Sequence, residues 1–108
     1  MSFTDTPTQP EPTAEAVQAM QGLTVLEFGT DWCPHCLGAQ KAIRTVLEPR
    51  ADVQHIKVED GPGKPLGRWL RVKLWPTLVL FKDGQEVARA VRPQGDGAVQ
   101  ALFDNAQA

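Results

Sequence analysis

Residues 26–36 read LEFGTDWCPHC, and this stretch decides both the fold and the chemistry of the chain. It runs from an apolar segment into Cys33 and Cys36, the two cysteines of the sequence. Cysteines separated by two residues serve as zinc ligands, as structural disulfides or as redox-active dithiols. The surrounding sequence has to distinguish these three uses.

The segment before the cysteines, LTVLEF at residues 23–28, is nearly continuous in apolar residues and is bounded by glycines. This pattern predicts a strand buried on both faces. After the cysteines, apolar residues recur at helical spacing until Pro49, which predicts a helix from about residue 34 to residue 48. Cys33 is therefore expected between a buried strand and the start of a helix.

Periodicity and turn residues predict the other elements. They are a helix at residues 14–20 with Thr13 as N-cap, a strand at 53–58, a short helix around RWLRV at 68–72, strands at 77–81 and 85–91, and a final helix whose apolar stripe is Val99, Leu102, Phe103 and Ala106. The Asp83-Gly84 pair accepts the positive φ angles of a type I′ turn, so the two last strands should form a hairpin.

This order of elements predicts an α/β fold in which a mixed sheet is covered by helices, with a parallel crossover between the first two strands. A chain of 108 residues with 42% hydrophobic content suits a single core. Residues 1–12 are rich in Pro, Thr, Gln and Glu, which predicts a disordered, mobile tail. The folded domain is therefore expected over residues 13–108.

The charge balance and the apolar segments exclude several partners. A formal net charge of −2 provides no broad positive field for nucleic acid or an anionic membrane. No apolar stretch approaches the roughly 20 residues that span a bilayer, and no signal or transit peptide is visible. We expect a cytoplasmic protein, and the reducing cytoplasm disfavours a purely structural disulfide.

A zinc site would need two ligands besides the cysteines, because structural zinc is tetrahedral. The two histidines of the chain are His35 and His55. His35 lies between the cysteines on a helical turn and is poorly placed to share one ion with both. We therefore expect no metal, and a zinc-binding module is a disfavoured alternative.

The redox use fits the predicted local structure. The sulfur of Cys33 should lie beside unpaired backbone N–H groups at the positive end of a helix, which favours the thiolate. Thiols at this spacing have pKa values lowered from about 8.5 to roughly 3.5–7.5. Cys36 lies one turn further, where it can attack a mixed disulfide at Cys33, and Pro34 suits the first helical turn.

His35 is expected to tune the dithiol. An imidazolium next to both sulfurs would favour the thiolate and so stabilise the reduced pair, which makes the pair a better oxidant. Potentials of such motifs span about −270 to −120 mV, or roughly 7 kcal/mol for two electrons. A solvated histidine without such an effect is the alternative.

LEFGTDWCPHC and WPTLVLFKDGQEV resemble the two signature blocks of the thioredoxin superfamily. The resemblance extends from about residue 23 to the final helix. It implies a thioredoxin-like fold with a central mixed four-stranded sheet that lacks the family's first strand. It also implies a thiol–disulfide oxidoreductase without an organic cofactor, in which Cys33 is the nucleophile and Cys36 the resolving thiol.

The resemblance assigns further residues to the site. Pro76 matches the family's cis-proline, whose neighbouring backbone pairs with the substrate, so Trp75, Pro76 and Thr77 are implied in substrate binding. Trp32 resembles the tryptophan that shields the active site. Glu27 matches a buried acid, usually aspartate, which would take the proton of Cys36.

Other positions leave alternatives open. His55 stands where many thioredoxins have a lysine near the buried acid, so it either pairs with Glu27 or lies on the surface. Trp69 is expected in helix packing. The Cys-Pro-His-Cys motif is closer to periplasmic disulfide oxidases than to ordinary thioredoxins. Gly29-Thr30 replaces a pair with an aromatic residue, and Arg92-Pro93 stands near a groove-lining glycine, so peptide docking is expected to differ.

We expect the partners to be disulfide-containing protein substrates and a recycling reductase, either thioredoxin reductase or a glutathione system. We expect no nucleic acid, no membrane and a monomer. The main rival is a redox-switched adaptor that presents Trp75 and a basic group without turnover. That basic group consists of Lys64, Arg68, Arg71 and Lys73. A glutathione-linked exchanger is a third possibility, although the sequence has no separate glutathione signature.

Overall fold

The computed structural model of the chain describes residues 3–106. Its helices and strands are, in chain order, α1 (Ala14–Gln18), β1 (Leu23–Gly29), α2 (Pro34–Leu47), β2 (Val53–Glu59), α3 (Pro65–Trp69), β3 (Thr77–Lys82), β4 (Gln85–Val91) and α4 (Asp96–Ala106). Within this part of the chain, no helix has the length and apolarity needed to span a bilayer.

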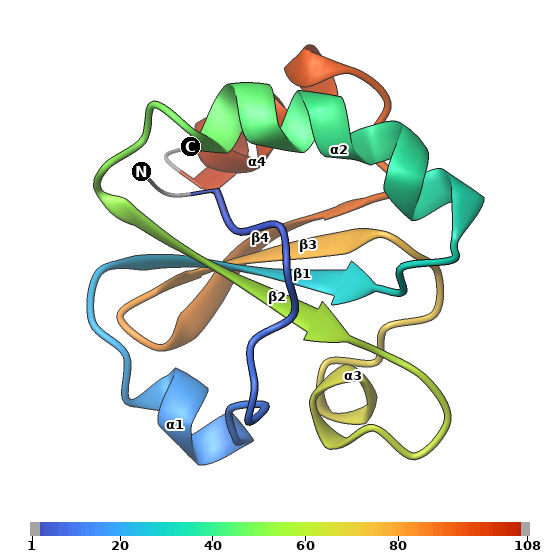
Figure 1. Cartoon of the computed structure of the whole chain (residues 1–108). Coiled ribbons are helices and arrows are strands. Elements are labelled where there is room, and N and C mark those ends of the chain that lie inside the picture. Colours follow the sequence, from blue (N-terminus) through green and yellow to red (C-terminus); the bar gives the residue numbers. More distant parts are fainter. Residues whose placement is uncertain (1–2, 107–108) are drawn as a thin grey trace.

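The four strands form one sheet in the order β2-β1-β3-β4. β1 and β2 are parallel, whereas β3 is antiparallel to both β1 and β4. Figure 1 shows α2 and α4 over one face of the sheet, with α1 and α3 on the other side. This is the predicted mixed four-stranded sheet flanked by helices, and no strand precedes β1 among the described residues.

β1 is buried on both faces because helices cover both sides of the sheet. Val25 belongs to the apolar cluster that includes residues of α2 and α4, whereas Leu26 and Phe28 belong to the cluster on the opposite face. Successive side chains of a strand point to opposite faces. Glu27 therefore points to the same face as Val25, beneath α2.

Two helices differ in extent from the prediction. α1 ends at Gln18, two residues before the predicted end, although Thr13 does accept a hydrogen bond from the amide of Ala16 as its N-cap. α3 covers Pro65–Trp69 rather than residues 68–72. The prediction was wrong there because Pro65 suits the first turn of a helix, and because Arg71 has a φ of 57°, which a helix cannot continue.

The predicted hairpin of β3 and β4 is confirmed. Asp83 and Gly84 have φ angles of 51° and 82°, as a type I′ turn requires. The turn is also tied to the start of β1, because the amide of Gly22 donates to Asp83 Oδ1 at 2.7 Å and the amide of Asp83 donates to the Gly22 carbonyl at 2.9 Å.

Residues 3–8 lie against β2, whereas the sequence predicts a tail over residues 1–12, of which 1–2 lie outside the described residues. The amide of Thr8 donates to the Lys57 carbonyl at 2.9 Å, and the Phe3 ring lies 5.3 Å from the His55 ring. Figure 1 shows this segment in dark blue, running past β2 toward α1. The difference arises because β2 is an edge strand with free backbone groups, which composition cannot reveal.

Candidate active site

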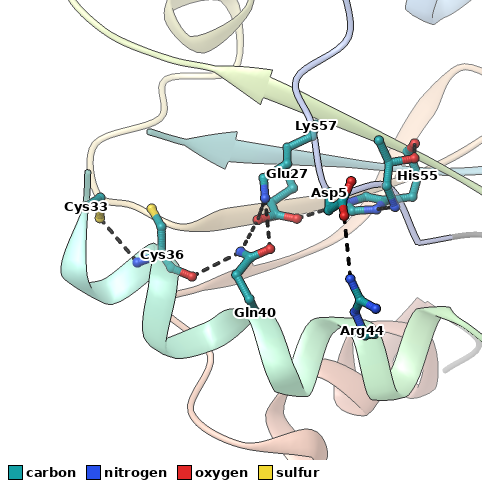
Figure 2. Close-up of polar contacts among 9 residues, drawn as sticks. Asp5, Glu27, Cys33, Cys36, Gln40, Arg44, His55 and Lys57 are labelled. Carbon is teal, nitrogen blue, oxygen red and sulfur yellow. Dashed lines mark hydrogen bonds and ion pairs between the residues drawn. The ribbon is translucent and has the colours of Figure 1, made fainter. Parts of the chain in front are cut away.

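The two cysteines lie at the beginning of α2, directly after the loop that follows β1. Cys33 is the N-cap residue and is only 5% exposed, and its Sγ accepts a hydrogen bond from the amide of Cys36 at 3.3 Å. Pro34 occupies the first turn, where a missing N–H leaves no carbonyl unpaired. Figure 2 shows both sulfurs at this first turn. The predicted position of Cys33 between a buried strand and a helix start is confirmed.

The surroundings of Cys33 favour its thiolate. Burial by itself raises the pKa of this thiol, but hydrogen bonds from the Cys36 side chain and from the backbone amides of Cys36 and His35 lower it, as does the positive charge of Arg92. The net result is a pKa below the ordinary value. His35 lowers the pKa of Cys33 through its backbone amide. The effect of its exposed side chain on the dithiol stays a prediction.

The surroundings of Cys36 have the opposite effect. Burial, the hydrogen bond to Cys33 and the negative charges of Cys33 and Glu27 raise the pKa of the Cys36 thiol to about 12, against a hydrogen bond from the Thr30 backbone. The structure thus favours the thiolate at Cys33 and the protonated thiol at Cys36.

Gly29, at the end of β1, makes room for Cys36. A Cβ on Gly29 would lie 2.5 Å from Cys36 Sγ, which is closer than real Cβ contacts allow. From the sequence, Gly29 is expected only as a strand boundary and as a departure from the family pattern. The available signal was its position directly after a buried strand and seven residues before Cys36.

Glu27 lies beneath α2, 1% exposed, and both of its carboxylate oxygens have partners. His55 Nε2 lies 2.9 Å from Oε1, and Gln40 Nε2 donates to Oε2 at 2.8 Å. Gln40 Nε2 also donates to the Cys36 carbonyl at 3.0 Å. Lys57 Nζ lies 3.9 Å from Oε2 and donates to Gln40 Oε1 at 2.8 Å. Figure 2 shows this network between α2 and the sheet.

Glu27 is thus buried, as predicted. Of the two alternatives for His55, a pair with Glu27 or a position on the surface, the structure has the pair with Glu27. Sequence reasoning did not identify Gln40 or Lys57. Gln40 could have been found, because it lies four residues after Cys36 and hence on the same face of α2. A cavity of about 520 Å³ between α2, β2 and the N-terminal segment reaches both Glu27 and Cys36.

Trp75 and Pro76 lie directly before β3, which begins at Thr77, and Trp75 contacts the tryptophan that precedes Cys33. The Trp75–Pro76 bond is cis, the isomer that the resemblance implied. Trp32 is 69% exposed and makes an edge-to-face contact with Trp75, with the ring centroids 5.8 Å apart. Trp75 Nε1 donates to Asp60 Oδ2 at 2.9 Å, which fixes the indole. The Thr77 side chain is buried and donates within its own turn to the Leu74 carbonyl.

Arg92 borders the same region from the end of β4. Its φ of 49° lies in the left-handed region, its amide donates to the Pro76 carbonyl at 2.8 Å, and its Nε donates to the Trp75 carbonyl at 2.9 Å. A hollow of about 330 Å³ lies between Arg92, Pro34 and His35. The sequence marked Arg92 as a departure from the family, but it did not reveal the effect on Cys33.

The other predicted features lie apart from the dithiol. Trp69 stacks on Phe81 with centroids 6.0 Å apart, so its predicted role in helix packing is confirmed. The basic group lies in and around α3, where Arg68, Arg71 and Lys73 are exposed. Over residues 3–106 no three His, Cys, Asp or Glu side chains lie together as a metal site would require.

The protein is a dithiol protein of the thioredoxin fold. Three features define this class here: the mixed four-stranded sheet, the two cysteines at the start of α2 and the cis-proline before β3. A family model described as thioredoxin matches residues 6–105, and the chain belongs to this family. Members of the family are thiol–disulfide oxidoreductases.

Similar proteins include thioredoxin 2 from Pseudomonas aeruginosa PAO1, whose reduced structure has 42% sequence identity and a TM-score of 0.83, with 96% of each chain covered. Thioredoxin from Chlamydia trachomatis is 34% identical over 76 residues, which are 65% of this chain and 69% of that protein. Thioredoxin H2-2 from Oryza sativa subsp. japonica is 31% identical over 74 residues, which are 68% of this chain and 55% of that protein. The match thus spans about half the length of the rice protein.

Proposed function

We propose that this protein is a protein-disulfide oxidoreductase that works through Cys33 and Cys36. The observation that carries the proposal is the opposite direction of the two pKa shifts, since the pKa of Cys33 is lowered while that of Cys36 is raised to about 12. A thiolate is the attacking species in disulfide exchange. Membership of the thioredoxin family supports the same chemistry.

The first step is attack by the Cys33 thiolate on one sulfur of a substrate disulfide. A bond forms between Cys33 and that sulfur, and the second substrate sulfur leaves as a thiolate that takes a proton from water. Trp32 and Trp75 border the site, and we propose that these rings and the backbone around Pro76 hold the substrate.

The second step releases the substrate. The Cys36 thiol gives its proton to Glu27 as its sulfur attacks Cys33, and the bound substrate sulfur leaves as a thiolate that is then protonated. Two electrons pass to the substrate, and the protein keeps a Cys33–Cys36 disulfide for a recycling reductase to reduce. Glu27→Gln is expected to slow this step and to leave the first step unchanged, as single-turnover kinetics would show.

The reduction potential is proposed to be more oxidising than that of an ordinary thioredoxin. Groups that stabilise the Cys33 thiolate stabilise the dithiol over the disulfide, and we propose that the His35 imidazole adds to them. His35→Gly should move the potential, measured against glutathione buffers, toward more reducing values. An unchanged potential would remove His35 from the tuning of the dithiol.

In a reducing cytoplasm such a protein acts mostly as a reductase. We also propose, from the sequence, that the protein is cytoplasmic and monomeric. Its proposed partners are a disulfide-containing protein substrate and either thioredoxin reductase or a glutathione system. A labelled Cys36→Ser variant should trap its substrates as mixed disulfides in cell extracts, and these would identify the substrates.

Reduction of insulin disulfides tests the proposed function. The wild-type protein should catalyse the reduction, and Cys33→Ser should abolish it, while Cys36→Ser should accumulate a mixed disulfide. Activity that survives Cys33→Ser would exclude the nucleophile. Binding of a partner by wild type and Cys33→Ser alike, without reduction by either, would favour the adaptor.

A further inference from the structure

We propose that the N-terminal segment, residues 3–8, belongs to the proton-transfer apparatus of the dithiol. The backbone amide of Thr4 holds His55 as the neutral tautomer that carries its hydrogen on Nε2, and this ring in turn positions Glu27. The consequence for catalysis depends on the proposed function, in which Glu27 accepts the proton of Cys36. The tautomer itself does not depend on that function.

The hydrogen bonds of the His55 ring define its tautomer. The amide of Thr4 lies 2.8 Å from Nδ1, and an amide nitrogen can only donate, so Nδ1 is the acceptor and carries no hydrogen. The hydrogen of the neutral ring then lies on Nε2, which is 2.9 Å from Glu27 Oε1. His55 is therefore a neutral donor to the carboxylate.

Further contacts hold the amide of Thr4 in this place. Thr4 Oγ1 donates to the His55 carbonyl at 3.1 Å, and the Phe3 ring packs on the imidazole. The guanidinium of Arg44 lies 4.6 Å from the centre of the Phe3 ring and 3.7 Å from Asp5, so α2 also contacts the segment. Figure 2 shows Asp5 and Arg44 beside the Glu27 network. The segment is thus fixed against both β2 and α2.

Protonation of His55 would break this arrangement. A hydrogen on Nδ1 would face the Thr4 amide hydrogen, so the imidazolium and the docked segment exclude each other. The charged groups around the ring are Glu27 from β1, Lys57 from β2, Arg44 from α2 behind Phe3, and Asp5 from the segment itself. While the segment is docked, Lys57 is the nearest cation to Glu27 among the described residues.

The charge of His55 affects how readily Glu27 accepts a proton from Cys36. A cationic His55 at 2.9 Å would stabilise the Glu27 carboxylate and weaken it as a base for Cys36. A neutral His55 leaves Glu27 more basic, which favours proton transfer from Cys36. The docked segment therefore maintains resolution of the mixed disulfide as the pH falls.

Thr4→Pro tests the proposal because it removes the amide hydrogen that the tautomer requires. Thr6→Pro is the matched control, since it stiffens the same exposed segment at an amide that does not contact His55. The ring ¹⁵N resonances of His55, recorded in the full chain, report the tautomer directly. Wild type, Thr6→Pro and Thr4→Ala, which keeps its amide, should show hydrogen on Nε2 alone.

Thr4→Pro should instead gain a hydrogen on Nδ1 on acidification, because Glu27 still accepts from Nε2 while no amide hydrogen faces Nδ1. The resolution rate of Thr4→Pro should fall below that of Thr6→Pro at pH 6, because a protonated His55 beside Glu27 disfavours transfer of the Cys36 proton to that carboxylate. The two variants should have similar rates at pH 8.

Three results would overturn the proposal. One is a hydrogen on Nδ1 in the wild-type protein, and another is an Nδ1 in Thr4→Pro that stays without hydrogen on acidification, as in Thr6→Pro. The third is a hydrogen gained on Nδ1 in Thr4→Pro with equal resolution rates for Thr4→Pro and Thr6→Pro at pH 6. A Cys36→Ser variant that forms no mixed disulfide would refute the proposed function. The NMR measurement of the tautomer does not depend on that function.

Discussion

Cys33 and Cys36 are chemically identical residues one helical turn apart, and their positions alone make them different. Cys33 receives amide hydrogen bonds at the start of α2, whereas Cys36 is buried near the negative charge of Glu27. The helix start and the acid were visible in the sequence, and so the division of roles between the thiols could be predicted. The network of Gln40 and Lys57 depends on how α2 and β2 approach each other, which periodicity does not reveal.

Arg92→Gly is expected to raise the pKa of the Cys33 thiol, because it removes a positive charge that lowers this pKa. The pH profile of alkylation by iodoacetamide should then shift to higher pH. The backbone should tolerate the change, since Arg92 already has a positive φ.

Arg89→Ala is the control for this change, because it removes a positive charge three residues earlier in the chain, at a residue paired with Glu86. Its alkylation profile should match that of wild type. Equal shifts in both variants would mean that the net charge of the protein, rather than Arg92, sets the reactivity of Cys33.

Gly29→Ala is expected to displace the Cys36 sulfur, because the new Cβ would lie 2.5 Å from it. We expect a loss of about 1–3 kcal/mol in the free energy of unfolding and slower resolution of the mixed disulfide. Gly38→Ala, within α2, is the control, because its Cβ would meet no atom within 4 Å. That variant should be as stable as wild type or more so; equal losses in both would refute the contact with Cys36.

At the scale of elements, strands and long helices were predictable because their apolar spacing is continuous. The Asp83-Gly84 turn was predictable because few residue pairs adopt two positive φ angles. α3 was misplaced because its apolar pattern is short, and Pro65 determines where it begins. Short elements depend on their first and last residues more than on periodicity.

Gly84→Ala is expected to weaken the packing of the hairpin against α1. Gly84 has a φ of 82°, and a Cβ there would collide with the backbone carbonyl of Gln18. Gly95→Ala shares the strained backbone, with a φ of 84°, but its Cβ would meet nothing within 4 Å. Gly95→Ala should cost about 1–2 kcal/mol, and denaturant unfolding should show a larger loss for Gly84→Ala. Equal losses of stability in the two variants would mean that α1 moves to make room for the new methyl group of Gly84→Ala.

At the scale of the whole molecule, the site is built from segments distant in the sequence. β1 provides Glu27, α2 provides the dithiol and Gln40, and β2 provides His55, while the N-terminal segment closes the network. The sequence predicted Glu27 and the dithiol, left the pairing of His55 as one of two alternatives, did not reveal Gln40, and assigned the N-terminal residues to a tail. Proline-rich composition argues against a core, yet it does not prevent a segment from pairing with the edge of a sheet.

The titration of the two thiols in the reduced protein, followed by the ultraviolet absorbance of the thiolates, tests the central claim most directly. One thiolate should form at lower pH than that of an ordinary cysteine, and a second should not form until close to pH 12. Loss of the first transition in Cys33→Ser would assign it. Two thiols that titrate together near the ordinary value would contradict the account.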